Sequence, residues 1–177
     1  MENPKLLKEY YMRSLRANLL IFVLMITSGC FYPAINGKVV DNVTGKPIEG
    51  ALVVAQWTKK HGFGLTYHDL YKITETLTDK DGTFSLTGTY DPFVEPPEMI
   101  IYKEGYIPWR NDMIFPGGRD GLIKDYEWKK NMTYKLDVFT DKYKTGLLYD
   151  FLDGGMMGRG SAEVPVFNDI LRKIPRY

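Results

Sequence analysis

Alternation of apolar and polar positions divides most of the chain after residue 34 into short segments typical of β-strands. Residues with turn chemistry, chiefly Gly, Pro, Asn and Asp, separate these segments. The pattern predicts an all-β domain with strands over residues 35–40, 52–57, 71–78, 83–87, 99–103 and 133–139.

Residues 35–57 carry the densest set of consistent local signals, two strand patterns joined by the turn Thr44-Gly45-Lys46-Pro47. In the second strand, residues 52–57, both faces are mostly apolar, which predicts a central position in a sheet. Gly37 interrupts the first strand. A glycine inside a strand predicts a bulge or a close approach of neighbouring backbone.

The next segments are more polar. Residues 58–70 include Gly62, Gly64, His61 and His68, and their irregular pattern predicts a long loop. Residues 71–78 have a Thr-rich, solvated face, and the tight turn at residues 79–82 predicts a hairpin with residues 83–87. The three prolines within residues 90–97 predict a loop or an edge, and residues 115–121 read as an exposed loop.

The period changes near the C-terminus, where apolar positions follow helical spacing. One helix is predicted over residues 142–152, with Asp141 as its N-cap and Gly154-Gly155 at its end. A second helix begins at Pro165 and stops before Pro175. We expect both helices to pack on the β-domain, with residues 154–160 as a flexible connection.

The N-terminus has the organisation of a secretory signal. Residues 1–16 are basic, and the apolar run at residues 19–26 is far shorter than the roughly 20 residues that span a bilayer. The run closes with Ile26-Thr27-Ser28-Gly29-Cys30, which resembles the lipobox of bacterial lipoproteins, although Thr27 replaces the usual Leu. The alternative is a plain secretory signal in which Cys30 is incidental.

The lipobox resemblance implies cleavage before Cys30, diacylglycerol on its sulfur and an acyl chain such as palmitate on its new amine. Two or three chains give stable membrane anchoring. Because Phe31 rather than Asp follows Cys30, analogy with Gram-negative sorting favours the outer membrane. The expected organisation is a lipoprotein signal peptide over residues 1–29 and a lipidated tether over residues 30–34.

Composition excludes several classes of protein. The 177 residues fit one domain plus a targeting segment. The 23 Lys and Arg are interspersed with 22 Asp and Glu, so the sequence offers no basic patch for nucleic acid. With Cys30 as the single cysteine, no internal disulfide can form.

Several motifs occur together in the order and spacing of a known family: Val39-Val40-Asp41, Thr44-Gly45-Lys46-Pro47-Ile48, Gly50-Ala51-Leu52-Val53, Thr78-Asp79, Asp81-Gly82-Thr83-Phe84 and Gly105-Tyr106. With these motifs, residues 35–110 resemble the carboxypeptidase regulatory-like domain. The resemblance implies an antiparallel, prealbumin-like β-sandwich of about seven strands, used as an accessory, adhesive or carbohydrate-associated module. We expect it to extend over residues 35–139, with a helical extension over residues 140–177.

No residue pattern predicts catalysis. The chain lacks the His-x-x-Glu of metallocarboxypeptidases and the Gly-x-Ser-x-Gly of a nucleophile elbow. His61 and His68 read as loop histidines rather than zinc ligands, and Asp79 and Asp81 read as turn residues rather than calcium ligands. We expect a non-enzymatic protein without metal or cofactor, and an enzyme remains a third alternative.

The candidate ligand-binding residues are aromatic: Tyr106, Trp109, Tyr126 and Trp128. Exposed rings in this region, residues 102–128, could stack on sugars or dock a protein. Alternatively, Trp109 and Trp128 close the bottom of the sandwich. The sequence thus predicts an envelope lipoprotein that binds or scaffolds a protein or polysaccharide, and a carbohydrate-binding module is the alternative.

Overall fold

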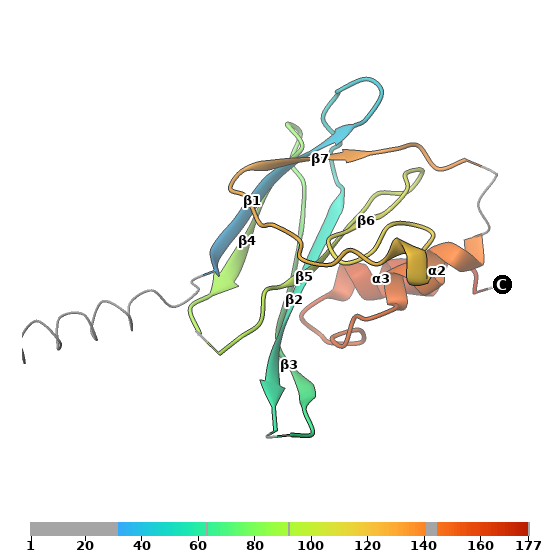
Figure 1. Ribbon diagram of the computed structural model, residues 1–177. Helices are drawn as coiled ribbons and strands as arrows, with labels where there is room; N and C mark the ends of the chain where they lie inside the picture. The colour runs from blue at the N-terminus through green and yellow to red at the C-terminus, as the bar shows by residue number, and fades with distance from the viewer. Residues whose placement is uncertain (1–31, 63, 92, 141–144, 177) are drawn as a thin grey trace, which may run out of the picture. The chain divides into compact units, whose positions relative to one another are not determined.

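The computed structural model describes residues 32–62, 64–91, 93–140 and 145–176, and the elements below belong to the compact unit of Tyr32–Thr89 and Phe93–Tyr177. In this unit seven strands precede two helices (Figure 1). Their bounds are β1 Tyr32–Asp41, β2 Leu52–His61, β3 Tyr67–Leu77, β4 Thr83–Thr89, β5 Glu98–Tyr102, β6 Trp109–Arg110, β7 Met132–Leu136, α2 Thr145–Asp153 and α3 Pro165–Lys173, with a short 3₁₀ turn η1 at Arg119–Gly121.

The strands form two sheets, in the orders β4-β1-β7 and β3-β2-β5-β6. Apolar side chains from both sheets, among them Val39, Val53 and Ile101, are fully buried in one core. The predicted all-β sandwich is therefore confirmed, and β2 is central as predicted. One pair differs from the antiparallel expectation, because β7 runs parallel to β1. The chain between these two strands, residues 42–131, is far longer than the dozen or so residues that the crossover of a parallel pair requires.

Tight turns in this fold pass the chain between sheets. Asp41 accepts hydrogen bonds from the backbone of Thr44 at 2.7 Å, from the Thr44 hydroxyl at 2.9 Å and from the backbone of Val43 at 3.0 Å, and those from Thr44 do most to lower the pKa of Asp41. This turn is the one predicted between the strands of residues 35–57, but β1 and β2 lie in different sheets.

The hairpin predicted around residues 79–82 is wrong. The turn itself exists, since Asp79 accepts hydrogen bonds from the backbone of Asp81 and Thr83 at 2.9 and 2.8 Å. However, β3 pairs with β2, whereas β4 pairs with β1 in the other sheet. Local turn chemistry reverses the chain but does not decide which strand becomes its hydrogen-bonded neighbour.

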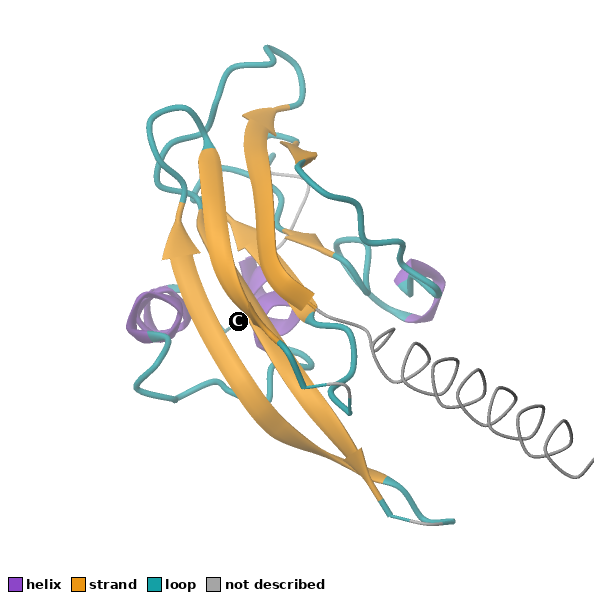
Figure 2. Ribbon diagram, turned by 90° about the vertical axis from the view of Figure 1, so that its left-hand side faces the viewer, coloured by secondary structure: helices purple, strands orange, loops and turns teal. Residues whose placement is uncertain are grey.

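The long loop predicted over residues 58–70 is also wrong. β2 continues to His61 and β3 begins at Tyr67, so the two strands pair beyond the sandwich as a ribbon (Figure 2). We call residues 58–62 and 64–70 the ribbon. Its residues beyond Lys59 are exposed, so there is no buried face to impose apolar alternation on the sequence.

Gly37 is required by aromatic rings rather than by backbone. A Cβ at this position would lie 2.7 Å from Cε2 of Tyr134 and 2.8 Å from Cε1 of Phe84, so no larger residue fits. Strand β1 also includes part of the tether predicted over residues 30–34, because Tyr32 pairs with Thr89 in the β1–β4 ladder.

Both C-terminal helices are confirmed, and they pack on the sandwich as expected. The predicted Asp141 cap lies outside the described residues. A second core joins the outer face of the β3-β2-β5-β6 sheet to the helices, with Leu52, Val54, Ile73, Ile100 and Tyr102 from the sheet and Leu148, Phe151, Leu152, Phe167 and Leu171 from the helices. No helix in the described part of the chain is long and apolar enough to cross a membrane.

Two segments predicted to be loosely placed contribute to this second core. Met156, in the connection expected to be flexible, is 2% exposed, and a Cβ on Gly158 would lie 2.5 Å from Cδ1 of Ile73. Phe115, in the loop expected to be exposed, is 9% exposed and stacks edge-on against Phe151 at 5.2 Å. Glycine and methionine here serve close packing.

Candidate functional site

The predicted lipidation site, Cys30, lies outside the described residues. Of the four predicted aromatic residues, the structure brings three together. The ring centroids of Trp109 and Tyr126 are 5.6 Å apart, and those of Tyr126 and Trp128 are 5.1 Å apart. Tyr106 has a different contact, since its hydroxyl donates a hydrogen bond to Asp41 at 3.2 Å.

The three gathered rings pack mainly on one another and on the sandwich core. Trp109 also meets the buried Tyr134 ring at 4.7 Å, and the interplanar angles of these pairs, 65° to 82°, are those of edge-to-face contacts. Trp109 and Trp128 are half-buried against the first core. This geometry favours the alternative in which they close one end of the sandwich.

The histidines lie on the ribbon and face carboxylates. His68 Nε2 is 3.2 Å from Glu95, and His61 Nε2 is 3.7 Å from Asp69. Among the residues that the structure describes, no group of three His, Cys, Asp or Glu side chains could hold a metal ion.

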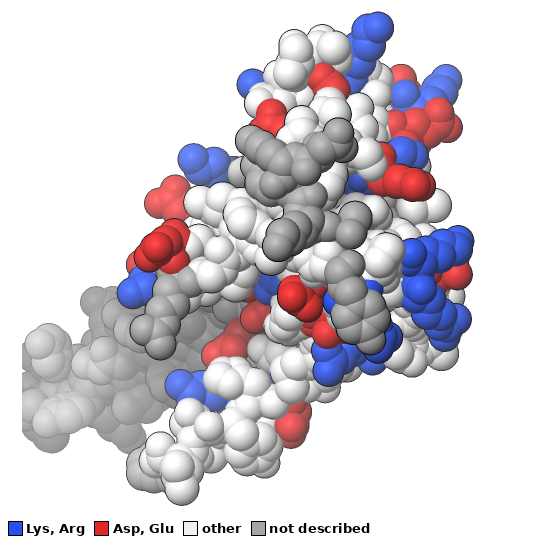
Figure 3. Space-filling model, turned by 90° about the vertical axis from the view of Figure 1, so that its right-hand side faces the viewer, with Lys and Arg blue, Asp and Glu red and all other residues white. Residues whose placement is uncertain are grey.

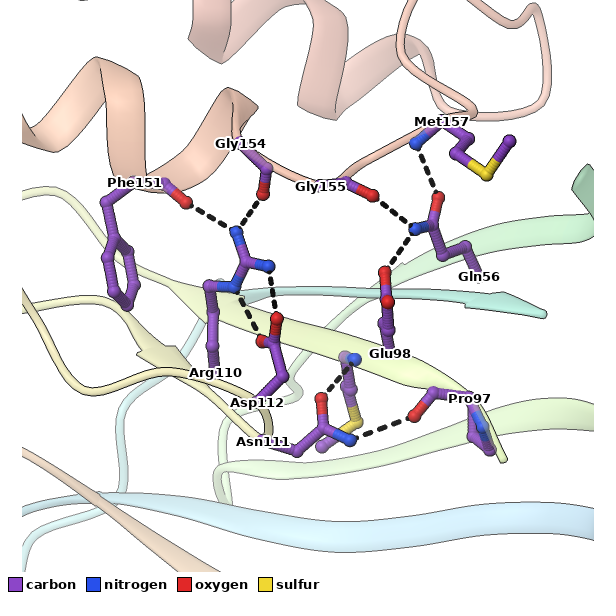
Figure 4. A network of polar contacts seen from close by, with 11 residues as sticks. Gln56, Pro97, Glu98, Arg110, Asn111, Asp112, Phe151, Gly154, Gly155 and Met157 are labelled. Carbon is purple, nitrogen blue, oxygen red and sulfur yellow. Dashed lines mark hydrogen bonds and ion pairs between the residues drawn. The ribbon is translucent and has the colours of Figure 1, made fainter. Parts of the chain in front are cut away.

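Arg110 joins the edge of the sheet to the end of α2 (Figure 4). Its side chain is 3% exposed and forms a bidentate ion pair with Asp112, in which Nε donates to Oδ1 at 2.8 Å and Nη2 donates to Oδ2 at 2.6 Å. Nη1 also donates to the backbone oxygens of Phe151, at 2.8 Å, and Gly154. These carbonyls end the helix and lack partners within it, so the guanidinium acts as its C-terminal cap.

Gln56 fixes the connection that follows α2. Its Nε2 donates to Glu98 at 2.5 Å and to the Gly155 carbonyl at 2.7 Å, while its Oε1 accepts from the Met157 backbone at 2.8 Å. Burial raises the pKa of Glu98, and the hydrogen bond from Gln56 opposes that rise. Figure 4 shows this amide standing between Glu98 and the connection.

Glu75 caps the other helix. Its two carboxylate oxygens accept from the backbone of Val166 at 2.8 Å and of Phe167 at 2.9 Å, in the first turn of α3. A carboxylate at this end also interacts favourably with the helix dipole. The sheet therefore holds α2 by a cation at its C-terminus and α3 by an anion at its N-terminus.

Sequence reasoning missed this network. The available signal was Gln56, the one polar residue within the apolar strand predicted at residues 52–57. A polar side chain at such a position needs a buried partner. Glu75 gave no signal, because glutamate on a solvated strand is ordinary.

A groove of about 550 Å³ lies where the two helices meet the sheet and the chain after β5. The residues that line it are Gly50, Leu52, Leu77, Tyr102, Lys103, Glu104, Gly105, Tyr106, Phe139, Leu148, Val166, Ile170, Lys173, Ile174 and Pro175.

Figure 3 views the protein from the side on which Figure 1 places the C-terminus. Lys, Arg, Asp and Glu are interspersed there with uncharged residues.

The groove has the chemistry of a site for an apolar or amphiphilic molecule. Leu52, Tyr102 and Ile170 belong to its apolar wall, whereas its charged residues are Lys103, Glu104 and Lys173. Lys173 also pairs with Asp169 at 2.6 Å. The volume of the groove falls within the roughly 300–1,000 Å³ of ligand pockets, which are mostly apolar with a few polar groups. Of the predicted binding residues, only Tyr106 lines it.

Comparison with known proteins leaves the family open. No family model matches the chain, and no curated protein matches it. A solved structure described as that of the streptococcal ancillary pilin is similar over 60% of this chain and 29% of its own, with 16% identity and a TM-score of 0.33. The chain thus spans less than a third of that protein, and a likeness at this level carries no argument about function.

Proposed function

We propose that this protein is a lipid-anchored, non-enzymatic binding protein of the bacterial cell envelope, held in the outer membrane through Cys30. The signal-like residues 1–29 and the position of the single cysteine support this anchor. Because β1 begins at Tyr32, two residues after Cys30, a lipid there would hold the sandwich next to the bilayer. Residues 140–177 act with the sandwich as one binding unit.

The groove carries the proposed binding role. It is mostly apolar, and the capped helices α2 and α3 form one of its walls. A wall held by hydrogen bonds at defined helix ends keeps its geometry before a ligand arrives, which lowers the entropic cost of binding. We infer that its ligand is a small apolar or amphiphilic molecule of the envelope.

The resemblance of residues 35–110 to the carboxypeptidase regulatory-like domain supports an accessory role. That domain is attached to metallocarboxypeptidases and does not carry their zinc site, so the resemblance brings no peptidase activity.

The anchor is tested by Cys30→Ala in the full chain, expressed in a bacterium. We expect the wild type to fractionate with membranes and to incorporate a fatty-acid analogue, and the variant to do neither. A variant that stays in the membrane fraction, or a wild type that incorporates no analogue, would contradict lipidation at Cys30.

The groove is tested with a fluorescent long-chain fatty acid as the probe. Ile170→Glu places a charge in the apolar wall. We expect this variant to bind the probe at least about tenfold more weakly, because the introduced side-chain carboxylate would lose its hydration when the acyl chain enters the groove. Leu122→Glu is the matched control, since Leu122 is 53% exposed and does not line the groove. Equal affinity in both variants would exclude the groove as the binding site.

Carbohydrate binding through Tyr106, Trp109, Tyr126 and Trp128 is the alternative, and the gathering of three of these rings is the observation in its favour. A polysaccharide pull-down with the full chain separates the two functions. Retention that Trp109→Ala and Trp128→Ala abolish would favour the sugar site. Fatty-acid binding that survives both substitutions would favour the groove.

A further inference from the structure

The ribbon presents its side chains in layers that follow its long axis. Gly62 and Gly64, both at positive φ, form the turn with Leu65. Behind the turn come four cross-strand pairs in order: His61 with Tyr67, Lys60 with His68, Lys59 with Asp69, and Thr58 with Leu70. The turn thus carries the apolar Leu65 beside the polar Thr66, the next layers are aromatic and basic, and acidic groups begin with Asp69.

Side-chain contacts stiffen this projection. The rings of His61 and Tyr67 stack across the two strands with centroids 5.4 Å apart. The Lys59 ammonium lies 4.4 Å from the centre of the Tyr71 ring. At its base, Lys59 also bridges to Val94, and the bulge between Trp57 and Thr58 changes the register where the ribbon leaves the sandwich. The ribbon is a stiff extension rather than a loose loop.

Large apolar side chains on and beside the ribbon are exposed to solvent. Leu65 is 94% exposed, Tyr67 59%, and Phe93, one residue before the Val94 bridge, 81%. Single exposed apolar residues are common on protein surfaces, but Leu65 and Tyr67 lie together at the end of one projection, which indicates a surface that is covered by a partner, while Phe93 lies beside the base.

We propose that the ribbon tip inserts into the interfacial region of a lipid bilayer. Leucine at the tip reaches the acyl boundary, tyrosine belongs to the headgroup level, and lysine directs its charge outward past an apolar stem. Pairs along the ribbon rise about 3.4 Å per residue, so Thr58 and Leu70 lie roughly 10 Å behind the His61 and Tyr67 pair. An insertion about 5–10 Å deep therefore takes in Leu65 and Tyr67 and leaves Asp69 at the water side.

The distribution of exposure selects a bilayer over a protein partner. Tyr67 to Tyr71 are exposed at every position, on both faces of the strand. A protein groove buries one face of a strand, whereas a lipid surface surrounds a tip on all sides. Lys59 and Lys60 are balanced by Asp69 and Glu95, so the attraction comes from the apolar tip and not from net charge. The inference rests on the ribbon and requires neither the groove nor Cys30.

The test places an environment-sensitive fluorophore at the tip of the full chain. Leu65→Cys and the matched Val43→Cys are labelled with a nitrobenzoxadiazole maleimide, and the parent chain with Cys30 alone gives the background. Val43 is 83% exposed but lies before β2, at the end of the strand opposite to the ribbon. The labelled chains are mixed with vesicles of phosphatidylethanolamine and phosphatidylglycerol, with and without brominated acyl chains.

We expect the probe at residue 65 to shift its emission to the blue and to be quenched at least about twofold by brominated lipid, and the probe at residue 43 to do neither. Equal behaviour of the two probes would overturn the proposal. A blue shift at residue 65 without quenching would also overturn it, because the tip would then be covered by protein.

Discussion

At the scale of single residues, Arg110 and Gln56 decide how the C-terminal part of the chain is held. Each uses a buried polar group to bind backbone atoms of the helical segment, and each is itself paired with a carboxylate of the sheet region. Such groups cost free energy when one partner is missing, so they specify one arrangement of helix on sheet rather than adding general stability.

Arg110→Met is expected to lower the free energy of unfolding by about 2–4 kcal/mol, because it removes the cap of α2 and leaves Asp112 without its cation. Urea denaturation followed by circular dichroism measures the change. Arg159→Met is the matched control, since Arg159 pairs with Asp153 near the same helix end but is 57% exposed, and its loss should cost less than about 1 kcal/mol. Similar costs for both substitutions would contradict the capping role.

Glu98→Gln is expected to change the pH dependence of stability. Burial raises the pKa of Glu98, so the folded state holds this proton more tightly than the unfolded state. The resulting stability is present below the ordinary glutamate pKa of 4.5 and is lost as the pH rises through the raised value. Glutamine keeps the acceptor for Gln56 and removes the buried charge.

We therefore expect Glu98→Gln to raise the urea midpoint above that of the wild type at neutral pH and to give no advantage well below pH 4.5. Measuring the midpoint across this range tests the prediction. Glu127→Gln, at an 83% exposed side chain, should leave the profile unchanged. The prediction fails if wild type and Glu98→Gln keep a constant difference at every pH.

At the scale of elements, the two C-terminal helices are short and depend on the sheet. Each has only nine residues, fewer than the roughly 12–15 that an isolated helix needs in water. Their apolar residues join the second core, and side chains of the sheet region satisfy their ends. The ribbon, in contrast, does not depend on a core: its strands extend beyond the sandwich, and cross-strand contacts keep them paired.

Glu75→Ala is expected to destabilise α3 by about 1–2 kcal/mol, since two amides in its first turn lose their acceptor. Hydrogen exchange at Val166 and Phe167 reports this locally. Glu163→Ala is the control, because Glu163 is exposed just before the same helix and its side chain does not contact these amides. Unchanged exchange in Glu75→Ala would show that packing alone holds the helix.

At the scale of the whole molecule, the sandwich has a core on each side of the β3-β2-β5-β6 sheet. The first lies between the sheets, and the second lies beneath the helices. Residues 145–176 therefore cover an apolar sheet face that would otherwise meet water, which makes them part of the folded unit and not an appendage.

A chain that ends at residue 140 is expected to aggregate or to bind a hydrophobic dye, because Leu52, Val54 and Ile100 would become exposed. Size-exclusion chromatography and dye fluorescence measure this. A chain that ends at Pro175 keeps both helices and should match the wild type in elution volume and in dye fluorescence. A shorter chain that stays soluble, cooperative and free of dye would show that the sandwich is complete without the extension.

Local patterns in the sequence were sufficient for the type of most elements. Apolar runs predicted the central strand β2 and the strand β5, and helical spacing with Pro165 predicted α3, because these features depend on neighbours within a few residues. The ribbon escaped prediction because an exposed strand pair needs no apolar alternation. Gly37 was recognised as special, but its aromatic neighbours Phe84 and Tyr134 come from distant strands.

The sequence by itself determined the all-β class, the two C-terminal helices, and the turns at residues 41–47 and 79–82. Only the tertiary structure decided which strands share a sheet, that β7 runs parallel to β1, and that Leu52, Tyr102 and Ile170 line one groove. The reason is physical. Turns and periodicity are set by local sterics and hydrogen bonding, whereas sheet partners and cavities depend on contacts between residues far apart in the chain.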